Sequence, residues 1–404
     1  MAPVDRRTQR TRVLLTAAIV LLLGLLVFLV ALFVVMVTPP GVTPASHGAA
    51  PEMSWVRSLY GFGPAASQQM RSPSSVAIAP SGDIYVADPT QARVFVFSPS
   101  GTFRRLIYTG GQGTRGQLLR PEAVAVDATG NAYVADSWAG KVIVFDPRGR
   151  FLREWPADHQ PRGIAVDGDR VYVLDVGEVV TYDTSGKRLG SFGSRGRKPG
   201  QIDAYLGITA KDRRIYVADS YNRRVEAFDS SGTLVWSTPS TQTAGAYGAL
   251  YATSTVSAAT TSTPAGFAWD LPQDVALDGN GHLLVVDAFR FDVTVLDAST
   301  GRVLKSYGTF GQGEGQFFYP TSIAYDPVRD WFAVADTNNN RVQVLLVPGS
   351  AKAPVAEVWR AAASPYRYLL APALVLLGAI AFALWLGWRV ARMREAPSDQ
   401  EQAL

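Results

Sequence analysis

The stretch "WFAVADTNNNRVQVL", Trp331–Leu345, decides how this chain folds. An apolar run closes on Asp336, three asparagines follow, and an alternating run begins at Arg341. Two such runs around a cluster of turn residues predict two β-strands joined by a tight turn. Related phrases occur earlier in the chain: "DIYVADPTQARVFVF" (Asp83–Phe97), "NAYVADSWAGKVIVF" (Asn131–Phe145), "RVYVLDVGEVVTY" (Arg170–Tyr182), "RIYVADSYNRRVEAF" (Arg214–Phe228) and "HLLVVDAFRFDVTVL" (His282–Leu296).

These phrases are copies of one repeating unit. In each copy the first apolar run ends with an aspartate. Successive aspartates are roughly 40 to 50 residues apart, except for one longer interval that contains an insertion. The aspartates are Asp88, Asp136, Asp175, Asp219, Asp287 and Asp336. A strand-rich repeat of this length predicts a β-propeller in which each copy forms one blade.

Each copy also supplies further strands. A short apolar run precedes the quoted phrase, as in Val124–Val126, and strands of this kind are typically buried on both faces. The third run alternates more, as in Val225–Phe228, and a fourth run follows in every copy except the last. The N-terminal stretch Ser54–Gly63 resembles these fourth runs. We therefore expect Trp55–Tyr60 to complete the last blade and to close a six-bladed, all-β ring without exposed sheet edges.

The strand order assigns the loops to the two faces of the ring. Successive connections in an up-and-down blade alternate between faces, so the borrowed strand begins on the face where the third strand of the last blade ends. The linkers 38–53 and 348–365 should both leave from that face. The opposite face carries the loops between second and third strands and the connections between blades, and it is predicted to be free for binding.

Two uncharged apolar segments, Val13–Val37 and Tyr368–Trp388, flank the repeats. Each reaches the roughly 20 residues that cross a bilayer as a helix. Arginines precede the first and follow the second, which predicts that both ends are cytoplasmic and the repeats are extracytoplasmic. Cleavage of the first segment as a signal peptide is the alternative, and it leaves the repeats outside as well. The predicted parts are a tail (1–12), a transmembrane helix (13–37), a linker (38–53), the propeller (54–347, with an insertion at 237–269), a linker (348–365), a second transmembrane helix (366–388) and a tail (389–404).

Composition excludes several classes of site. The chain has no cysteine, so it has no disulfide and no thiolate metal site. Its formal charge of +4 does not indicate nucleic-acid binding, because seven arginines flank the apolar segments and are explained by topology. Its three histidines are scattered and do not form a usual metal-ligand set with the acids. We predict no metal, no cofactor and no nucleic-acid partner.

The repeat resembles the NHL repeat. The matching stretches are Pro161–Asp167, Ile215–Phe228 and Val334–Leu345, and the resemblance extends over residues 54–347. It implies a six-bladed propeller but leaves the activity open, because a fold does not dictate a function. The family includes partner- or ligand-binding ectodomains of bacterial receptors, RNA-binding modules, and a minority of lyases and lactonases. RNA binding conflicts with the predicted extracytoplasmic location.

The recurrent aspartate is followed five residues later by a basic residue in four copies: Arg93, Lys141, Arg224 and Arg341. We interpret this pattern as scaffolding. The aspartate is placed to accept hydrogen bonds from turn amides, and the basic residue is placed to brace the same loop.

A membrane-tethered lyase or hydrolase with its site at the channel mouth is the alternative function. Propeller enzymes place acid–base groups at the channel mouth, at the starts of the inner strands. Glu122 and Asp274 are the only carboxylates at these positions, Arg162 lies between them in blade order, and His159 is the one histidine near the mouth. This set is too thin for us to predict a catalytic site.

A binding surface is better supported. Aromatic residues and arginines, the usual anchors of interfaces, gather on the predicted free face. The predicted binding residues are Trp138, Arg162, Tyr221, Arg223, Phe289, Arg290 and Phe291, and the inter-blade loops add Phe317–Tyr319. We predict a binding or scaffolding subunit of an envelope complex in the plasma membrane, with a protein as its partner and an anionic polymer or a small ligand as alternatives. The insertion is rich in Thr, Ala and Ser and is predicted to be a tolerated loop, with a lid over the channel as the alternative.

Overall fold

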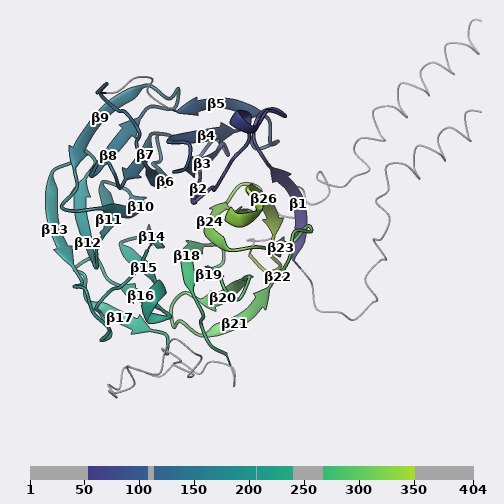
Figure 1. The fold of residues 1–404 in the computed structure, drawn as a ribbon. Coiled ribbons are helices and arrows are strands. Elements are labelled where there is room, and N and C mark those ends of the chain that lie inside the picture. The colour runs from purple at the N-terminus through teal and green to yellow at the C-terminus, as the bar shows by residue number, and fades with distance from the viewer. Residues whose placement is uncertain (1–52, 108–112, 206, 240–266, 351–404) are drawn as a thin grey trace, which may run out of the picture. The chain divides into compact units, whose positions relative to one another are not determined.

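The computed structural model describes residues 53–107, 113–205, 207–239 and 267–350. They form six four-stranded antiparallel sheets arranged as a ring around a central channel (Figure 1). Each sheet is one blade, with its first strand innermost and its fourth strand on the outside. The predicted number of blades is therefore confirmed.

The strands follow the repeats of the sequence. Blade one consists of β2 (Ser75–Ile78), β3 (Ile84–Asp88), β4 (Arg93–Phe97) and β5 (Phe103–Ile107). Blade two consists of β6 (Pro121–Val126), β7 (Ala132–Asp136), β8 (Lys141–Phe145) and β9 (Phe151–Pro156). Blade three consists of β10 (Pro161–Asp167), β11 (Arg170–Asp175), β12 (Glu178–Asp183) and β13 (Arg188–Phe192).

The second half repeats the pattern. Blade four consists of β14 (Ile208–Lys211), β15 (Arg214–Asp219), β16 (Arg224–Phe228) and β17 (Leu234–Ser237), and blade five of β18 (Pro272–Leu277), β19 (His282–Asp287), β20 (Asp292–Asp297) and β21 (Val303–Tyr307). Blade six consists of β24 (Pro320–Asp326), β25 (Trp331–Asp336), β26 (Arg341–Leu346) and β1 (Ser54–Leu59). The smaller elements are the parallel pair β22 (Thr309–Phe310) and β23 (Gln316–Phe317) and the 3-10 turns η1 (Ala66–Gln68), η2 (Ser220–Asn222) and η3 (Thr337–Asn339).

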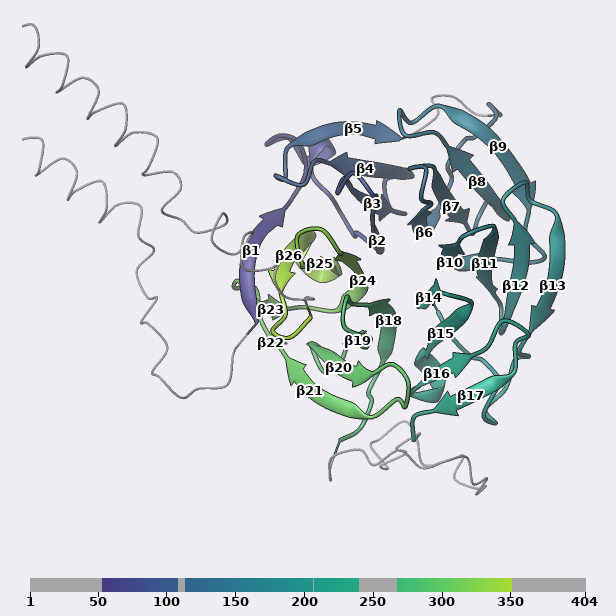
Figure 2. The same cartoon turned by 180° about the vertical axis from the view of Figure 1, so that it is seen from behind.

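The N-terminal strand closes the ring. β1 runs antiparallel to β26, with Ser54 opposite Leu346 and Leu59 opposite Val342, and Figure 2 shows it as the outer strand of blade six. Ser54 and Leu346 thus lie at the same end of one sheet. We call that side the chain-end face and the other the distal face.

The predicted membrane segments, 13–37 and 366–388, lie outside the described residues, as do both tails and most of the two linkers. Within the ranges that the structure describes, no helix has both the length and the apolar character needed to cross a bilayer.

The apolar core is divided among the seams between blades. Each of the six seams has its own cluster of buried side chains, which come from the two blades that meet there. Second strands such as β3, β7 and β25 are buried at every position. A strand wedged between two blades has no solvated face, so its sequence is apolar up to the aspartate that ends it, as predicted.

The recurrent aspartates hold the inter-blade linkers. Asp136 accepts hydrogen bonds from the amides of Leu119 (2.6 Å) and Arg120 (2.9 Å). The scaffolding interpretation of the acid is therefore confirmed. The interpretation of the basic residue holds for Arg341, which donates to Asp336, but it is wrong for Lys141, whose ammonium pairs with Glu154 at 2.7 Å.

The asparagines of the quoted stretch also serve the turn. Asn339 donates from Nδ2 to Asp336 Oδ2, and Asn340 has a left-handed backbone with φ of 53°. Four other blades have a left-handed residue at the same position, four residues after the acid: Ala92, Gly140, Arg223 and Phe291. Asparagine adopts this conformation more easily than other side chains apart from glycine, which explains its presence here.

The predicted insertion is shorter than its bounds suggested. Ser237 belongs to β17, and Trp269 is buried in the seam between blades four and five, where Phe267 packs against the same cluster. Residues 240–266, the bulk of the insertion, lie outside the described residues.

Candidate functional site at the channel mouth

The central channel contains a cavity of about 560 Å³. Its walls are the first strands of the six blades, and its lining reaches the turns that follow them, including Pro80, Ala128 and Pro327. Toward the distal face the lining begins at Ser75 and Ala123, one residue inside the predicted mouth positions Ser74 and Glu122. The hollow therefore lies toward the chain-end face, and most of the mouth residues are not part of it.

Asp274 is the one predicted catalytic residue that lines this cavity. Its Oδ2 accepts hydrogen bonds from Ser322 Oγ (2.6 Å) and from the amide of Ile323 (3.1 Å), and its Oδ1 accepts from the amide of Val275 (2.8 Å). Burial raises the pKa of Asp274 to about 7, against the effect of these donors. The carboxyl therefore changes its charge near neutral pH.

The same contacts join neighbouring blades. Ser322 Oγ accepts from the amide of Val76 (3.1 Å), and Ser75 Oγ accepts from the amide of Val124 (3.2 Å). In both pairs a side chain from one inner strand satisfies an amide of the next blade's inner strand, as Asp274 does for Ile323. These amides lie on a sheet edge that has no further strand to pair with, so the contacts have a structural purpose.

Glu122 lies at the distal mouth and is almost completely buried. Its Oε1 is 2.6 Å from Arg120 Nε and 4.0 Å from Arg162 Nη1, and it also accepts from Ser137 Oγ (3.2 Å). The ion pair of Glu122 with Arg162 is thus longer than the one with Arg120. A buried carboxylate flanked by two guanidinium groups is a satisfied anchor that fixes both arginines.

These arginines lie against aromatic rings. Arg120 is 5.3 Å from the centroid of the Trp138 ring, and Arg162 is 4.6 Å from that of Tyr205. Hydrogen bonding to Glu122 raises the pKa of Arg120, and Tyr205 makes a smaller contribution in the same direction. Blade two and the linker into blade four therefore meet at the mouth.

The aromatic set continues on the other side of the mouth. Tyr319, in the linker into blade six, packs edge-to-face with Phe289 of blade five at 5.6 Å between ring centroids. Burial raises the pKa of Tyr319, with Tyr221 and Tyr205 adding to the effect. Tyr319 also has a left-handed backbone (φ of 60°), a strained conformation for an aromatic residue. We call these residues the mouth collar: Arg120, Trp138, Arg162, Tyr205, Tyr221, Phe289 and Tyr319.

The most exposed members of the collar are aromatic side chains. Trp138 is 71% exposed, Tyr221 61% and Phe289 55%. Large rings that are mostly exposed beside fixed guanidinium groups can stack on, and donate hydrogen bonds to, a docking partner.

The other predicted binding residues have internal contacts. Arg290 pairs with Asp292 (2.9 Å), donates to the carbonyl of Ala268 and stacks on Phe267. Phe291 packs against Phe310 and against the cluster between blades five and six.

Two further loop residues were named from the sequence. Arg223 lies in the left-handed turn position after η2 and is partly exposed. Phe317, expected in an outward aromatic loop, is fully buried, because β23 turns its side chain into the seam between blades five and six.

The predicted catalytic residues have different partners. Glu122 and Arg162 approach each other at the mouth, whereas Asp274 bonds to blade six inside the channel. His159 is exposed, and its backbone amide donates to Asp175 at 2.7 Å. The structure records no contact that joins His159 or Asp274 to Glu122. Within the described ranges, no group of three or more His, Cys, Asp or Glu residues is placed to hold a metal ion.

Sequence reasoning missed Tyr205. Its signal was its place in the linker just ahead of an inner strand, in "YLGITA", three residues before β14 begins at Ile208.

Comparison with known proteins agrees with this architecture. A family profile described as a 6-bladed beta-propeller matches residues 67–186. The protein is a six-bladed β-propeller. None of the curated proteins matches the chain.

A solved structure supports this fold. A Bacteroides thetaiotaomicron protein of unknown function is 15% identical over 74% of this chain and 76% of its own, with a TM-score of 0.52. Hydrazine synthase of Kuenenia stuttgartiensis is 14% identical over 76% of this chain and 99% of its own, with a TM-score of 0.47. Virginiamycin B lyase from Staphylococcus aureus is 10% identical over 72% of this chain and 98% of its own, also with a TM-score of 0.47. At these identities the likeness concerns the fold alone.

Proposed function

We propose that this propeller is a binding or scaffolding subunit of a membrane-anchored envelope complex and that the mouth collar is its docking surface for a protein partner. The observation that carries the proposal is the group of exposed rings, Trp138, Tyr221 and Phe289, beside arginines that Glu122 and Tyr205 hold in place. Preorganised aromatic and arginine side chains are the residues that dominate binding energy at interfaces.

The orientation of the ring supports this choice of face. Both chain ends leave from the chain-end face, and the apolar segments 13–37 and 366–388 lie beyond them in the sequence. Two spans anchored on that side leave the collar on the side that faces away from the membrane. The proposed location is therefore the plasma membrane, with the propeller extracytoplasmic.

The test is recovery of the partner with collar variants. The full-length chain carrying Trp138→Ala, Tyr221→Ala and Phe289→Ala should retain its fold, because these rings are exposed. The amount of partner recovered with it after crosslinking should fall by about tenfold or more. The matched control replaces three exposed leucines on outer strands: Leu152→Ala, Leu189→Ala and Leu304→Ala. Equal recovery of the partner with the collar variant and the control would refute the collar as the docking surface.

A lyase or hydrolase is the second candidate, and one observation favours it. Asp274 combines a pKa near neutrality with a position on the wall of the cavity, which suits a general acid or base. Neither Glu122 nor His159 lines that cavity, so the proposed chemistry would depend on Asp274 alone. If an Asp274→Asn variant still recovers the partner and still supports the activity of the complex, this candidate is excluded.

A further inference from the structure

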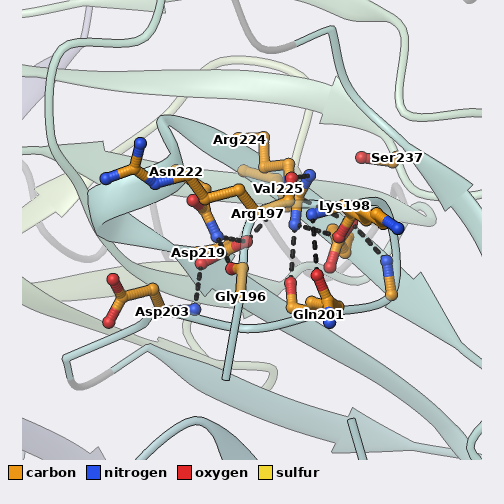
Figure 3. Close-up of polar contacts among 12 residues, drawn as sticks. Gly196, Arg197, Lys198, Gln201, Asp203, Asp219, Asn222, Arg224, Val225 and Ser237 are labelled. Carbon is orange, nitrogen blue, oxygen red and sulfur yellow. Dashed lines mark hydrogen bonds and ion pairs between the residues drawn. The ribbon is translucent and has the colours of Figure 1, made fainter. Parts of the chain in front are cut away.

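The linkers into blades four and six are fastened by the same clasp. In blade four, Asn222 Nδ2 donates to the carbonyl of Gly196 (2.8 Å), and Arg224 donates to the carbonyls of Lys198 (2.8 Å) and Gln201 (2.6 Å). Figure 3 shows these groups converging on the linker from β16 and the preceding turn. The clasp fixes residues 196–201 against the blade.

Blade six repeats this arrangement atom for atom. Asn339 Nδ2 donates to the carbonyl of Gly311 (3.0 Å), and Arg341 donates to the carbonyls of Gly313 (2.8 Å) and Gln316 (3.0 Å). In both blades the arginine also donates from Nε to the recurrent acid at 2.8 Å. Blade six is therefore an internal control for blade four.

The two clasps differ in their outer contacts, since Arg224 also donates to the carbonyl of Arg197 (2.8 Å) and Arg341 also bonds to Tyr60. The difference that changes the charge is the buried residue two positions after the arginine. Blade six has Gln343, whose Oε1 accepts from the amide of Gly315 (3.0 Å) and whose Nε2 donates to Asp336 (3.1 Å) and to the carbonyl of Gln316 (2.7 Å). Each polar atom of this buried side chain thus has a partner of the right kind. Such a neutral amide completes the clasp without adding charge.

Blade four has Glu226 instead. Its Oε1 accepts from the amide of Gly200 (3.0 Å) and lies 3.1 Å from Arg224 Nε. An ionised carboxylate has no hydrogen to donate to Asp219 or to the carbonyl of Gln201, as Gln343 does in its own blade. Its Oε2 is buried without a hydrogen bond of sound geometry, although Ser237 lies nearby on β17. The sequence alternation at Val225–Phe228 does not give this side chain a solvated face, because all of β16 is buried.

Charge distinguishes the two clasps further. Arg224 is shared by Asp219 and Glu226, and all three side chains are buried, at 3%, 0% and 0% exposure. With both acids ionised the blade-four clasp carries one excess negative charge, whereas Arg341 and Asp336 balance each other in blade six. An excess charge in such a place is costly, so one acid tends to take up a proton.

The electrostatics agree with this count. Burial raises the pKa of Glu226 to about 7, with Asp219 adding to the rise and Arg224 opposing it. Burial also raises the pKa of Asp219, against Arg224 and Asn222. From the remaining elements, the linker contributes the backbone of Arg197 and Lys198 to the clasp, and β17 contributes the uncharged Ser237.

We propose that the blade-four clasp is a proton-sensitive tether for the basic loop 195–198, closed when Glu226 holds a proton and loosened when Glu226 is ionised. The protonated carboxyl is neutral and gains an O–H donor, so it takes the place that the amide of Gln343 has in blade six. The loop carries Arg195, Arg197 and Lys198 on the distal face. Any effect of the tether on docking depends on the proposed function, because this loop lies on the proposed docking face. The existence of the tether does not depend on that function.

Hydrogen exchange of the full-length chain in detergent tests the tether without any partner. Protection factors, corrected for the intrinsic pH dependence of exchange, are measured at pH 5.5 and 8.5 for residues 195–202 and for the equivalent segment 310–317. We expect protection of the blade-four segment to fall roughly tenfold or more as pH rises, and that of the blade-six segment to stay within about twofold. Unchanged protection of the blade-four segment in the wild-type chain refutes the proposal.

Exchanging the two residues sharpens the test. Glu226→Gln should abolish the pH dependence of segment 195–202, and Gln343→Glu should create one in segment 310–317. If Gln343→Glu does not fold, the comparison of the two segments in the wild-type chain and the result for Glu226→Gln still test the proposal. A pH dependence that survives Glu226→Gln assigns the effect to another group and overturns the proposal. Equal recovery of the partner with the collar variant and its control would refute the docking surface but would leave this result untouched, so the two proposals fail separately.

Discussion

The backbone of Leu59 pairs with that of Val342, so a strand from one end of the propeller sequence completes the sheet made by the other end. Leu59 is buried in the cluster between blades six and one, next to Val76 and Val344. The ring is therefore closed at one place, in blade six, where the N-terminal strand β1 pairs with β26. The stability of the whole propeller depends on a strand of six residues.

Leu59→Ala should open this seam. Removing a buried leucine side chain costs about 2 to 5 kcal/mol of unfolding free energy, and here it also weakens the last blade's outer strand. Leu304→Ala is the matched control, because Leu304 lies on the outer strand of blade five but is exposed. Urea denaturation followed by tryptophan fluorescence measures both. Equal midpoints for the two variants would contradict closure by β1.

Arg224→Met should be strongly destabilising. The substitution keeps much of the side-chain volume but leaves Asp219 and Glu226 buried without their shared cation, and breaking a buried ion pair in this way costs about 3 to 5 kcal/mol. Arg302→Met, at an exposed position, should change the unfolding free energy by less than about 0.5 kcal/mol. Chemical denaturation near pH 7 gives the unfolding free energies of the two variants for comparison. A small effect of Arg224→Met would mean that the two acids are already protonated there.

Asp274 should make stability depend on pH. Burial raises the pKa of Asp274 from 3.8 to about 7, so the folded protein binds a proton more tightly than the unfolded chain does. The stabilisation is fully present below about pH 4 and is lost as pH rises through about 7, a difference of about 4 kcal/mol. Unfolding free energies measured at intervals from pH 4 to 8 should fall less steeply for Asp274→Asn than for the wild type. Parallel curves would show that the carboxyl stays ionised.

Arg223→Asn should stabilise the protein. Arg223 has a left-handed backbone (φ of 54°), as Asn340 does in blade six (φ of 53°), and asparagine tolerates this conformation better than arginine. We expect a gain of about 0.5 to 1 kcal/mol. Arg148→Asn, at an exposed position outside the left-handed set, controls for the loss of charge. Thermal unfolding distinguishes the pair, and an equal shift in both would assign the effect to charge.

The fold was largely predictable because its determinants are local. The apolar runs, the aspartate that ends each second strand and a turn after it recur within each copy, and they form the same four-stranded sheet in every blade, although the turn of blade three is shorter. The fourth run missing from the last copy pointed to Ser54–Gly63, and β1 confirms that prediction.

The candidate site was less predictable. The sequence correctly placed Trp138, Tyr221 and Phe289 on exposed tips, but it placed Phe317 on the surface and overlooked Tyr205. Whether an aromatic ring in a linker points outward or into a seam depends on the neighbouring blade, which sequence spacing does not encode.

The repeated pattern of the chain by itself determined six blades, their closure and the common side of both chain ends, because each follows from periodicity and strand order. Only the tertiary structure decided that the hollow of the channel lies toward the chain-end face, that Arg120 and Arg162 share Glu122, and that Glu226 is buried beside Arg224 where blade six has Gln343. These relationships join side chains from separate repeats or from a strand and a distant linker. Their charges and hydrogen bonds act through space, so they exist only once the ring has closed.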